Sequence, residues 1–192
     1  LSTQPNAIQN IAADMSDGDL KLKNQTNMKV AVVENRTVTP KVNVDGLKTK
    51  STDIQMAAGQ KLTVEGKLTS TDDTKIEADD LDLGDNKVNV TKKLTLEKAD
   101  KTQAINIGTG TGDWNINNAA YGKIKIGGSN QDADINIKGA TFKNPSDIET
   151  KKKVVLTGAT KAGANGGSDM KIKAHTAELP TASDTLAVKN LD

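Results

Sequence analysis

The residues best suited to chemistry are a cluster of aspartates near the middle of the chain. Asp80 and Asp82 flank Leu81, and Asp85 follows shortly after them. Side chains alternate between the two faces of a strand, so Asp80 and Asp82 would project together, as the paired carboxylates of a polysaccharide-active enzyme must. The same oxygen atoms could bind calcium. Sugar-active sites also tend to use aromatic residues and arginines, which are missing nearby, so an ordinary solvated face is favoured.

A second weak calcium motif lies at residues 127–132, which read GGSNQD. This segment approaches the G-G-x-G-x-D turn of calcium-binding β-rolls, but Asp134 occupies the position of the expected aliphatic residue and Ile135 follows one position late. Such rolls bind their ions through tandem copies, and this is one imperfect copy. Calcium is therefore a minor expectation, and no other cofactor is expected; the possible ligands are Asp80, Asp82, Asp85, Asp132 and Asp134.

Other catalytic classes lack the residues that they need. His175 is the only histidine and the chain has no cysteine, so neither a histidine cluster nor a thiolate site can hold zinc. No G-x-S-x-G turn is present for a serine hydrolase. We expect His175 to be a solvated side chain beside a strand, and we expect the protein not to be an enzyme.

Charge and composition argue against a nucleic-acid partner and against a bulky core. The 26 basic and 25 acidic residues are mixed along the chain, and Arg36 is the only arginine. Nucleic-acid binding requires a concentrated basic face instead. The hydrophobic fraction is 34% and the aromatic fraction 2%. Small aliphatic side chains must therefore form a thin core, and Trp114 and Tyr121 are the candidates for an exposed aromatic binding surface. No apolar run is long enough for a transmembrane segment.

The elements that must position these residues are short strands. Two aliphatic residues flank one polar residue in repeated triplets, and this period of two indicates β structure. Gly, Asn, Asp, Ser and Thr separate the triplets and supply tight turns. Helical spacing is weak, and the best candidate is Gln4–Met15. The twelve triplets are Leu20–Leu22, Val30–Val32, Val42–Val44, Ile54–Met56, Leu62–Val64, Leu81–Leu83, Val88–Val90, Leu94–Leu96, Ile105–Ile107, Ile124–Ile126, Ile135–Ile137 and Met170–Ile172.

Strands this short become stable when each one stacks on the equivalent strand of a neighbouring coil. The pattern therefore predicts an all-β protein, a right-handed parallel β-helix, or β-solenoid. A β-sandwich with turns every 8–12 residues remains the alternative. We expect an N-terminal cap or extended arm at 1–18, solenoid repeats at 19–158 and less regular coils at 159–192.

Asparagine recurs at the centre of the triplets. With the flanking aliphatic residues turned inward, these asparagines would face outward, where stacked coils could align them into side-chain ladders. The alternative interpretation is a merely polar outer face, and the sequence does not separate the two. The residues concerned are Asn43, Asn89, Asn106, Asn115 and Asn136.

The stretch Ala104–Phe142 resembles the repeats of filamentous haemagglutinin-like exoproteins, the adhesins exported by two-partner secretion. The matching elements are Ile105–Gly108, Trp114–Ala119, Ile124–Gly127 and the segment from Asp132 to Gly139. The resemblance implies a right-handed parallel β-helix at the cell surface that contacts host cells, other bacteria or a matrix. The N-terminal secretion module of that family is not found in this sequence.

These observations lead to three functional hypotheses. The first is a secreted bacterial surface adhesin segment, a rigid scaffold that binds host or bacterial surface molecules, glycans or matrix. The second is a self-assembling subunit of an extracellular filament, in which the N-terminal arm pairs with the sheet edge of the next subunit. The third, a minor one, is a polysaccharide-active β-helix enzyme that uses Asp80 and Asp82.

Overall fold

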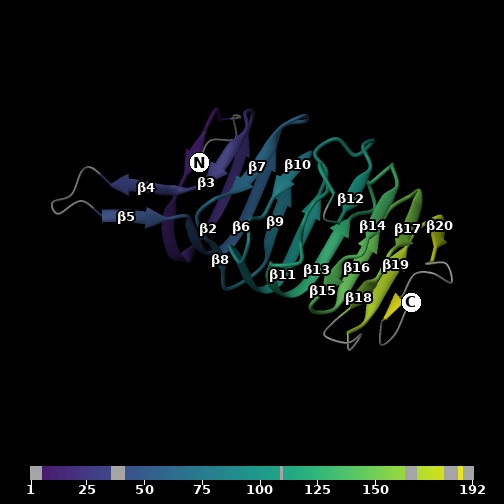
Figure 1. The fold of residues 1–192 in the computed structure, drawn as a ribbon. Helices are drawn as coiled ribbons and strands as arrows, with labels where there is room; N and C mark the ends of the chain where they lie inside the picture. The colour runs from purple at the N-terminus through teal and green to yellow at the C-terminus, as the bar shows by residue number, and fades with distance from the viewer. Residues whose placement is uncertain (1–5, 36–41, 109, 163–167, 180–185, 188–192) are drawn as a thin grey trace.

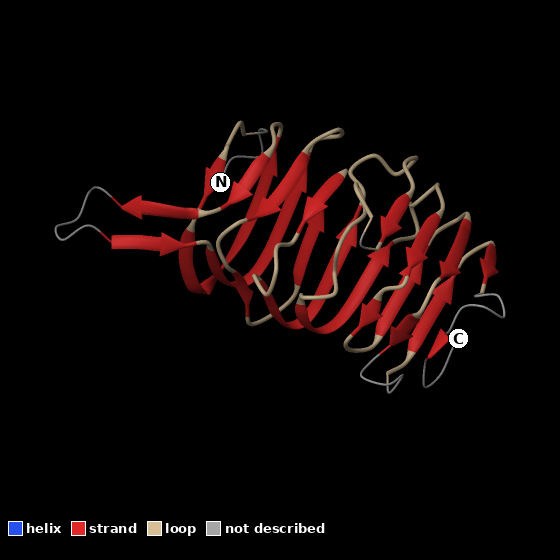
Figure 2. Ribbon diagram, in the orientation of Figure 1, coloured by secondary structure: helices blue, strands red, loops and turns tan. Residues whose placement is uncertain are grey.

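The computed structural model describes residues 6–35, 42–108, 110–162, 168–179 and 186–187 (Figure 1). Within these ranges every regular element is a strand, so the predicted all-β class is confirmed (Figure 2). The helix suggested for Gln4–Met15 is wrong for the described residues 6–15, which form strands and their links. A membrane-spanning helix is likewise not found in the described ranges.

Most strands are three to five residues long, and four are longer: β2 with 12 residues, β6 and β11 with 10 each, and β13 with 8. The bounds are β1 Asn10–Ile11, β2 Ala13–Asn24, β3 Met28–Val30, β4 Val32–Asn35, β5 Val42–Asp45, β6 Leu47–Met56, β7 Lys61–Val64, β8 Leu68–Ser70, β9 Thr74–Glu77, β10 Asp80–Asp82, β11 Val88–Glu97, β12 Ile105–Ile107, β13 Ala120–Gly127, β14 Ile135–Lys138, β15 Thr141–Phe142, β16 Ser146–Glu149, β17 Lys153–Thr157, β18 Thr160–Ala162, β19 Met170–Lys173, β20 Thr176–Glu178 and β21 Leu186–Ala187.

The strands pair in parallel almost throughout. The main sheet has the order β19-β16-β13-β11-β8-β6-β2, with β9 also paired to β6 and β11. Smaller parallel sheets have the orders β1-β3-β7-β10, β12-β14-β17-β20 and β15-β18-β21. Among the described strands only β4 and β5 pair antiparallel. This arrangement does not fit the β-sandwich alternative, whose two sheets are antiparallel.

Aliphatic residues of successive strands stack in register and form the core. One continuous row begins at Leu22 and Ile54, and each partner lies on the neighbouring strand of the main sheet. Its members on the first six strands are buried, because period two turns these side chains to the inner face, where parallel pairing places them side by side. The whole row is Leu22, Ile54, Ile76, Leu96, Ile126, Ile148 and Ile172.

Two triplets depart from the expected inward orientation: Val30–Val32 and Val42–Val44, whose Val44 is only half-buried on the antiparallel strand β5. Val30 is fully buried, but Val32 is 54% exposed because the chain leaves the stack at Ala31. Residues 32–35 and 42–45 then form the hairpin of β4 and β5, which projects away from the parallel sheets (Figure 1). The chain returns at Gly46, whose amide donates to the Ala31 carbonyl.

The expected segment boundaries differ from the strand boundaries. The division between residues 18 and 19 falls inside β2, and β1 and β2 pair with β3 and β6 of the same chain. Residues 10–11 and 13–18 therefore belong to the sheets. Residues 1–5 and much of 159–192 lie outside the described ranges. In that last segment, β19 still pairs with β16, while β20 is exposed along its whole length.

Candidate functional site

The aspartates singled out in the sequence make separate local contacts. Asp80 forms an ion pair with Lys61 at 3.3 Å, and one oxygen of Asp82 accepts a hydrogen bond from the Gly84 amide. Asp85 accepts a hydrogen bond of 2.6 Å from the side chain of Asn118. These contacts hold turns and neighbouring strands, and they are what surface carboxylates ordinarily do.

The second calcium motif is also divided among structural contacts. Asp132 pairs with Lys152 at 3.2 Å, and Asp134 accepts a hydrogen bond from the Lys153 amide. The structure does not bring the five predicted ligands together. In the part of the chain that it describes, no three acidic, histidine or cysteine residues are grouped so that they could hold a metal ion.

The prediction of an exposed aromatic surface is wrong. Trp114 is 1% exposed and Tyr121 is 4% exposed. The Tyr121 hydroxyl accepts a hydrogen bond from the Lys143 amide, and burial raises the pKa of Tyr121 to about 12. A chain so poor in aromatics places its largest side chains inside, because their burial contributes most to stability. His175, in contrast, is exposed as predicted.

The most densely organised polar surface is the outer face of the main sheet. Side chains of adjacent strands align there in two rows, which alternate with the buried aliphatic row. The first row contains Asp53, Lys75, Thr95, Lys125 and Asp147. The second row contains Gln55, Glu77, Glu97, Gly127, Glu149 and Lys173.

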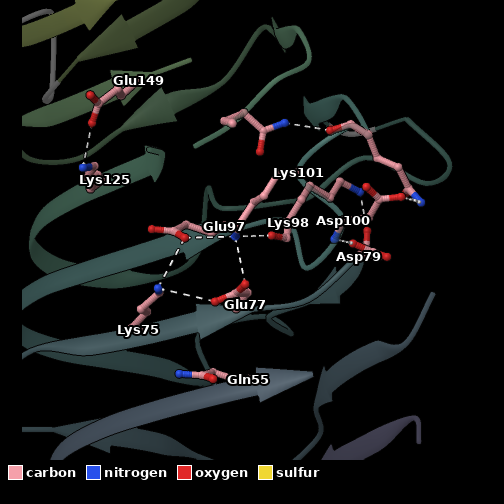
Figure 3. A network of polar contacts seen from close by, with 12 residues as sticks. Gln55, Lys75, Glu77, Asp79, Glu97, Lys98, Asp100, Lys101, Lys125 and Glu149 are labelled. Atoms are coloured by element: carbon pink, nitrogen blue, oxygen red, sulfur yellow. Dashed lines mark hydrogen bonds and ion pairs between the residues drawn. The ribbon is translucent and has the colours of Figure 1, made fainter. Parts of the chain in front are cut away.

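Three side chains of this face, Lys75, Glu77 and Glu97, form a closed ring of ion pairs with Lys101 from the turn after β11, which we call the ion-pair ring (Figure 3). Lys75 contacts Glu77 at 3.4 Å and Glu97 at 3.3 Å. Lys101 contacts the same two carboxylates at 2.9 and 3.0 Å. Burial alone would lower the pKa of Lys75, but Glu97 and Glu77 outweigh it and raise that pKa.

Beside the ion-pair ring, a second cluster ties the turn after β11 to its neighbours. Asp79 is buried, and its carboxylate accepts hydrogen bonds from the amides of Gly59 and Asp100. Lys98 donates to the Asp79 carbonyl and lies 5.0 Å from the centre of the Trp114 ring. Burial lowers the pKa of Lys98, although Asp79 and Asp80 oppose the effect.

Sequence reasoning missed the ion-pair ring and the Asp79 cluster. Lys75 and Glu97 are far apart along the chain and meet because β9 pairs with β11. Only the alternation of charged and aliphatic residues within each strand could have marked them as outward facing. Chemically, both clusters hold strands and turns together. In the ion-pair ring the charges are paired in equal number, so the ring provides no isolated base or nucleophile.

The comparisons with known proteins add no relative: no protein-family model matches the sequence, and no curated protein or solved structure is significantly similar to the chain. Any functional proposal therefore depends on the fold and the contacts described above.

Proposed function

We propose that the chain is a rigid, non-catalytic segment of an extracellular bacterial surface adhesin, a right-handed parallel β-helix of the filamentous haemagglutinin-like type. The observation that carries the proposal is the aliphatic row that runs in register from Leu22 to Ile172 across the main sheet. Such a row is the core of a repeat architecture, in which each strand is stabilised by its neighbours.

The location of the repeat elements supports the resemblance that suggested this family. Within Ala104–Phe142, the aliphatic pairs at 105–107 and 135–137 lie on adjacent strands, β12 and β14, and are fully paired. The pair at 124–126 lies on β13 and stacks between β11 and β16. The recurring short motif thus coincides with the strands that stack.

Binding by this scaffold would use its polar outer faces. Because Trp114 and Tyr121 are buried, adhesion cannot depend on them as exposed aromatic anchors. Lysine, asparagine and threonine side chains on the strand faces remain for contacts with host or bacterial surface molecules, glycans or matrix. Each such contact is weak, so binding would need many of them at once.

The proposal can be tested with beads that carry the purified chain. We expect them to bind epithelial or bacterial cells several-fold more than beads carrying Leu96→Asp, counted by microscopy. Leu96 is fully buried in the aliphatic row, so this variant loses the fold while its surface residues are unchanged. Equal binding by both proteins, or release of reducing sugar from polysaccharides by the parent chain, would contradict the proposal.

A filament subunit is the second candidate, and one observation favours it. The strand β2 is twelve residues long and ends the order of the main sheet. Among described residues, only a bridge from Asn6 to Asn24 lies on its other side. An edge of this kind can pair with another chain. The arm exchange predicted for residues 1–18 would require β1 and β2 to leave their own sheets, so edge pairing is the simpler mode. Concentration-dependent filaments in negative-stain microscopy would identify it.

A further inference from the structure

A small polar cleft opens between the ion-pair ring and the turn at 128–131. It has a volume of about 160 Å³, which is room for roughly five water molecules. Its walls are the side chains of Lys75, Glu97, Lys101 and Lys125 together with residues 128–131. Figure 3 shows that Lys125 lies on the neighbouring strand β13, where it faces Glu149.

The turn contributes one buried acceptor without a partner in the described part of the chain. Gln131 is 1% exposed, and its amide nitrogen donates to the Gln103 carbonyl at 2.7 Å. Its carbonyl oxygen Oε1 has no hydrogen-bond partner among the residues that the structure describes. An unsatisfied buried acceptor is destabilising. Because Oε1 is itself buried, a ligand hydroxyl reaches it when the Gln131 amide turns towards the cleft, and the new hydrogen bond then favours binding.

A second acceptor lies on Glu97. Both of its lysine contacts are made by Oε2, at 3.3 Å to Lys75 and 3.0 Å to Lys101. The other oxygen, Oε1, is turned towards Gly128. A Cβ atom added to Gly128 would lie 3.3 Å from this oxygen. The cleft therefore offers two oxygen acceptors, which suit the hydroxyl groups of a ligand.

The lysines of the cleft also have N–H donors that make no contact with its carboxylates. Each ammonium group has three N–H donors. Lys101 uses its three on Glu77, Glu97 and the Lys98 carbonyl. Lys75 contacts two carboxylates and keeps one donor. Among the described residues Lys125 pairs only with Glu149, at 2.8 Å, and keeps two donors. Thr95 of β11 lies between Lys75 and Lys125 in the register of the sheet. The backbones of the two lysines are therefore two strand spacings apart, about 9–10 Å.

We propose that this cleft binds a hydroxylated carboxylate, the chemistry of a sugar acid. The ligand carboxylate accepts from the ammonium of Lys125, while its hydroxyl groups donate to Gln131 Oε1 and Glu97 Oε1 and one accepts from Lys75. Glu77, Glu97 and Glu149 face four lysines, because Lys173 also pairs with Glu149 at 3.0 Å. The single net positive charge favours a monoanion over a phosphate dianion. This inference goes beyond the proposed adhesive role and does not depend on where the protein is located.

Such a ligand could be free or part of an acidic polysaccharide. A second cleft of about 270 Å³ adjoins the first and shares Ser129 with it. Its walls include Lys151 and Lys173, so a chain of acidic sugars could extend along the stack of strands. A polymer of glucuronate that binds more tightly per residue than the monomer would identify the polysaccharide as the source, and equal affinity would identify the free acid.

The test is a calorimetric titration of the purified chain with glucuronate, with glucose as the uncharged comparison. We expect saturable binding of glucuronate, and affinity for glucose about tenfold lower because one charge-assisted hydrogen bond is lost. Lys125→Gln should weaken glucuronate binding by about tenfold. The matched control is Lys123→Gln, on the same strand, which loses an ion pair with Asp147 at 2.7 Å but does not line the cleft. Its affinity should stay within about twofold of the parent.

Three results would overturn the proposal. They are the absence of glucuronate binding to the folded parent, equal affinities for glucuronate and glucose, and equal losses in the Lys125 and Lys123 variants. Circular dichroism establishes that each variant is folded, and Lys75→Gln repeats the test if Lys125→Gln is not. The titration contains no cells, so its failure would leave the adhesion proposal to its own bead experiment.

Discussion

Asn136 donates a hydrogen bond of 2.9 Å to the side-chain oxygen of Asn106, across the paired strands β14 and β12. This is one rung of an asparagine ladder, which is one of the two interpretations that the triplets allow. The next position in the register is Val155, which ends the ladder after a single rung. Asn115 instead accepts a hydrogen bond from the Asn117 amide in its own turn. The ladder is therefore confined to this one pair among the described asparagines of the triplets.

Removing that rung should have a small, measurable effect. We expect Asn106→Ala to lower the free energy of unfolding by about 0.5–1.5 kcal/mol, the net value of a neutral hydrogen bond. Urea unfolding followed by circular dichroism measures the change. Asn89→Ala is the control, because Asn89 is also exposed at the centre of a triplet but makes no side-chain hydrogen bond to another described residue. If both variants lose the same stability, the rung contributes nothing.

Gly46 is required where the hairpin rejoins the sheet. Its φ is +76°, and a Cβ atom there would lie 1.9 Å from the Lys67 carbonyl oxygen. Gly46→Ala should therefore lower the free energy of unfolding by at least about 2–4 kcal/mol, the sum of backbone strain and a clash with main-chain atoms. The midpoint of urea unfolding measures this loss.

Gly59 separates the two causes of that loss. Its φ is +77°, but nothing lies within 4 Å of an added Cβ. Gly59→Ala should cost only the strain of a left-handed residue, about 1–2 kcal/mol. Similar losses in the two variants would mean that the return of the chain at Gly46 is not closely packed.

The ion-pair ring should contribute more than an isolated surface pair. Glu97→Gln leaves Lys75 and Lys101 with one carboxylate in a partly buried site, and we expect a loss of about 1–2 kcal/mol in unfolding free energy. The matched variant Glu65→Gln breaks an exposed pair with Lys29 and should cost less than about 0.5 kcal/mol. Raising the salt concentration should reduce the stability loss of Glu65→Gln more than that of Glu97→Gln, because salt screens exposed charges most strongly. A larger loss for Glu65→Gln would refute this ranking.

The ionisation of Tyr121 can be followed by itself, because it is the only tyrosine in the chain. Burial raises its pKa to about 12 from an ordinary value of 10.0. The folded state therefore holds this proton more tightly than the unfolded state. Its contribution to stability is complete below about pH 10 and is lost as the pH rises from 10 towards 12.

Ultraviolet absorbance of tyrosinate measures this titration directly. We expect a midpoint near pH 12 in the folded chain and near 10 in concentrated urea. A folded midpoint near 10 would mean that Tyr121 is accessible to solvent, and it would reopen the possibility that this ring belongs to a binding surface.

The sequence by itself determined the class of structure and the direction of most strand side chains. In Ile54–Met56 and Ile105–Ile107, the flanking aliphatic residues are buried as the triplets predict. Period two is a property of the local backbone, so it assigns inner and outer faces before any partner strand is known. Exposure of His175 followed from the same kind of local reasoning.

Only the tertiary structure decided which residues meet. The ion-pair ring, the cleft beside Gln131 and the burial of Trp114 all depend on which strand stacks on which. That register depends on the lengths of the segments between the stacked strands, such as the one that contains β4 and β5. The alternation of residues within one strand does not predict which other strand it will pair with. That pairing forms only when the connecting segment closes into a loop.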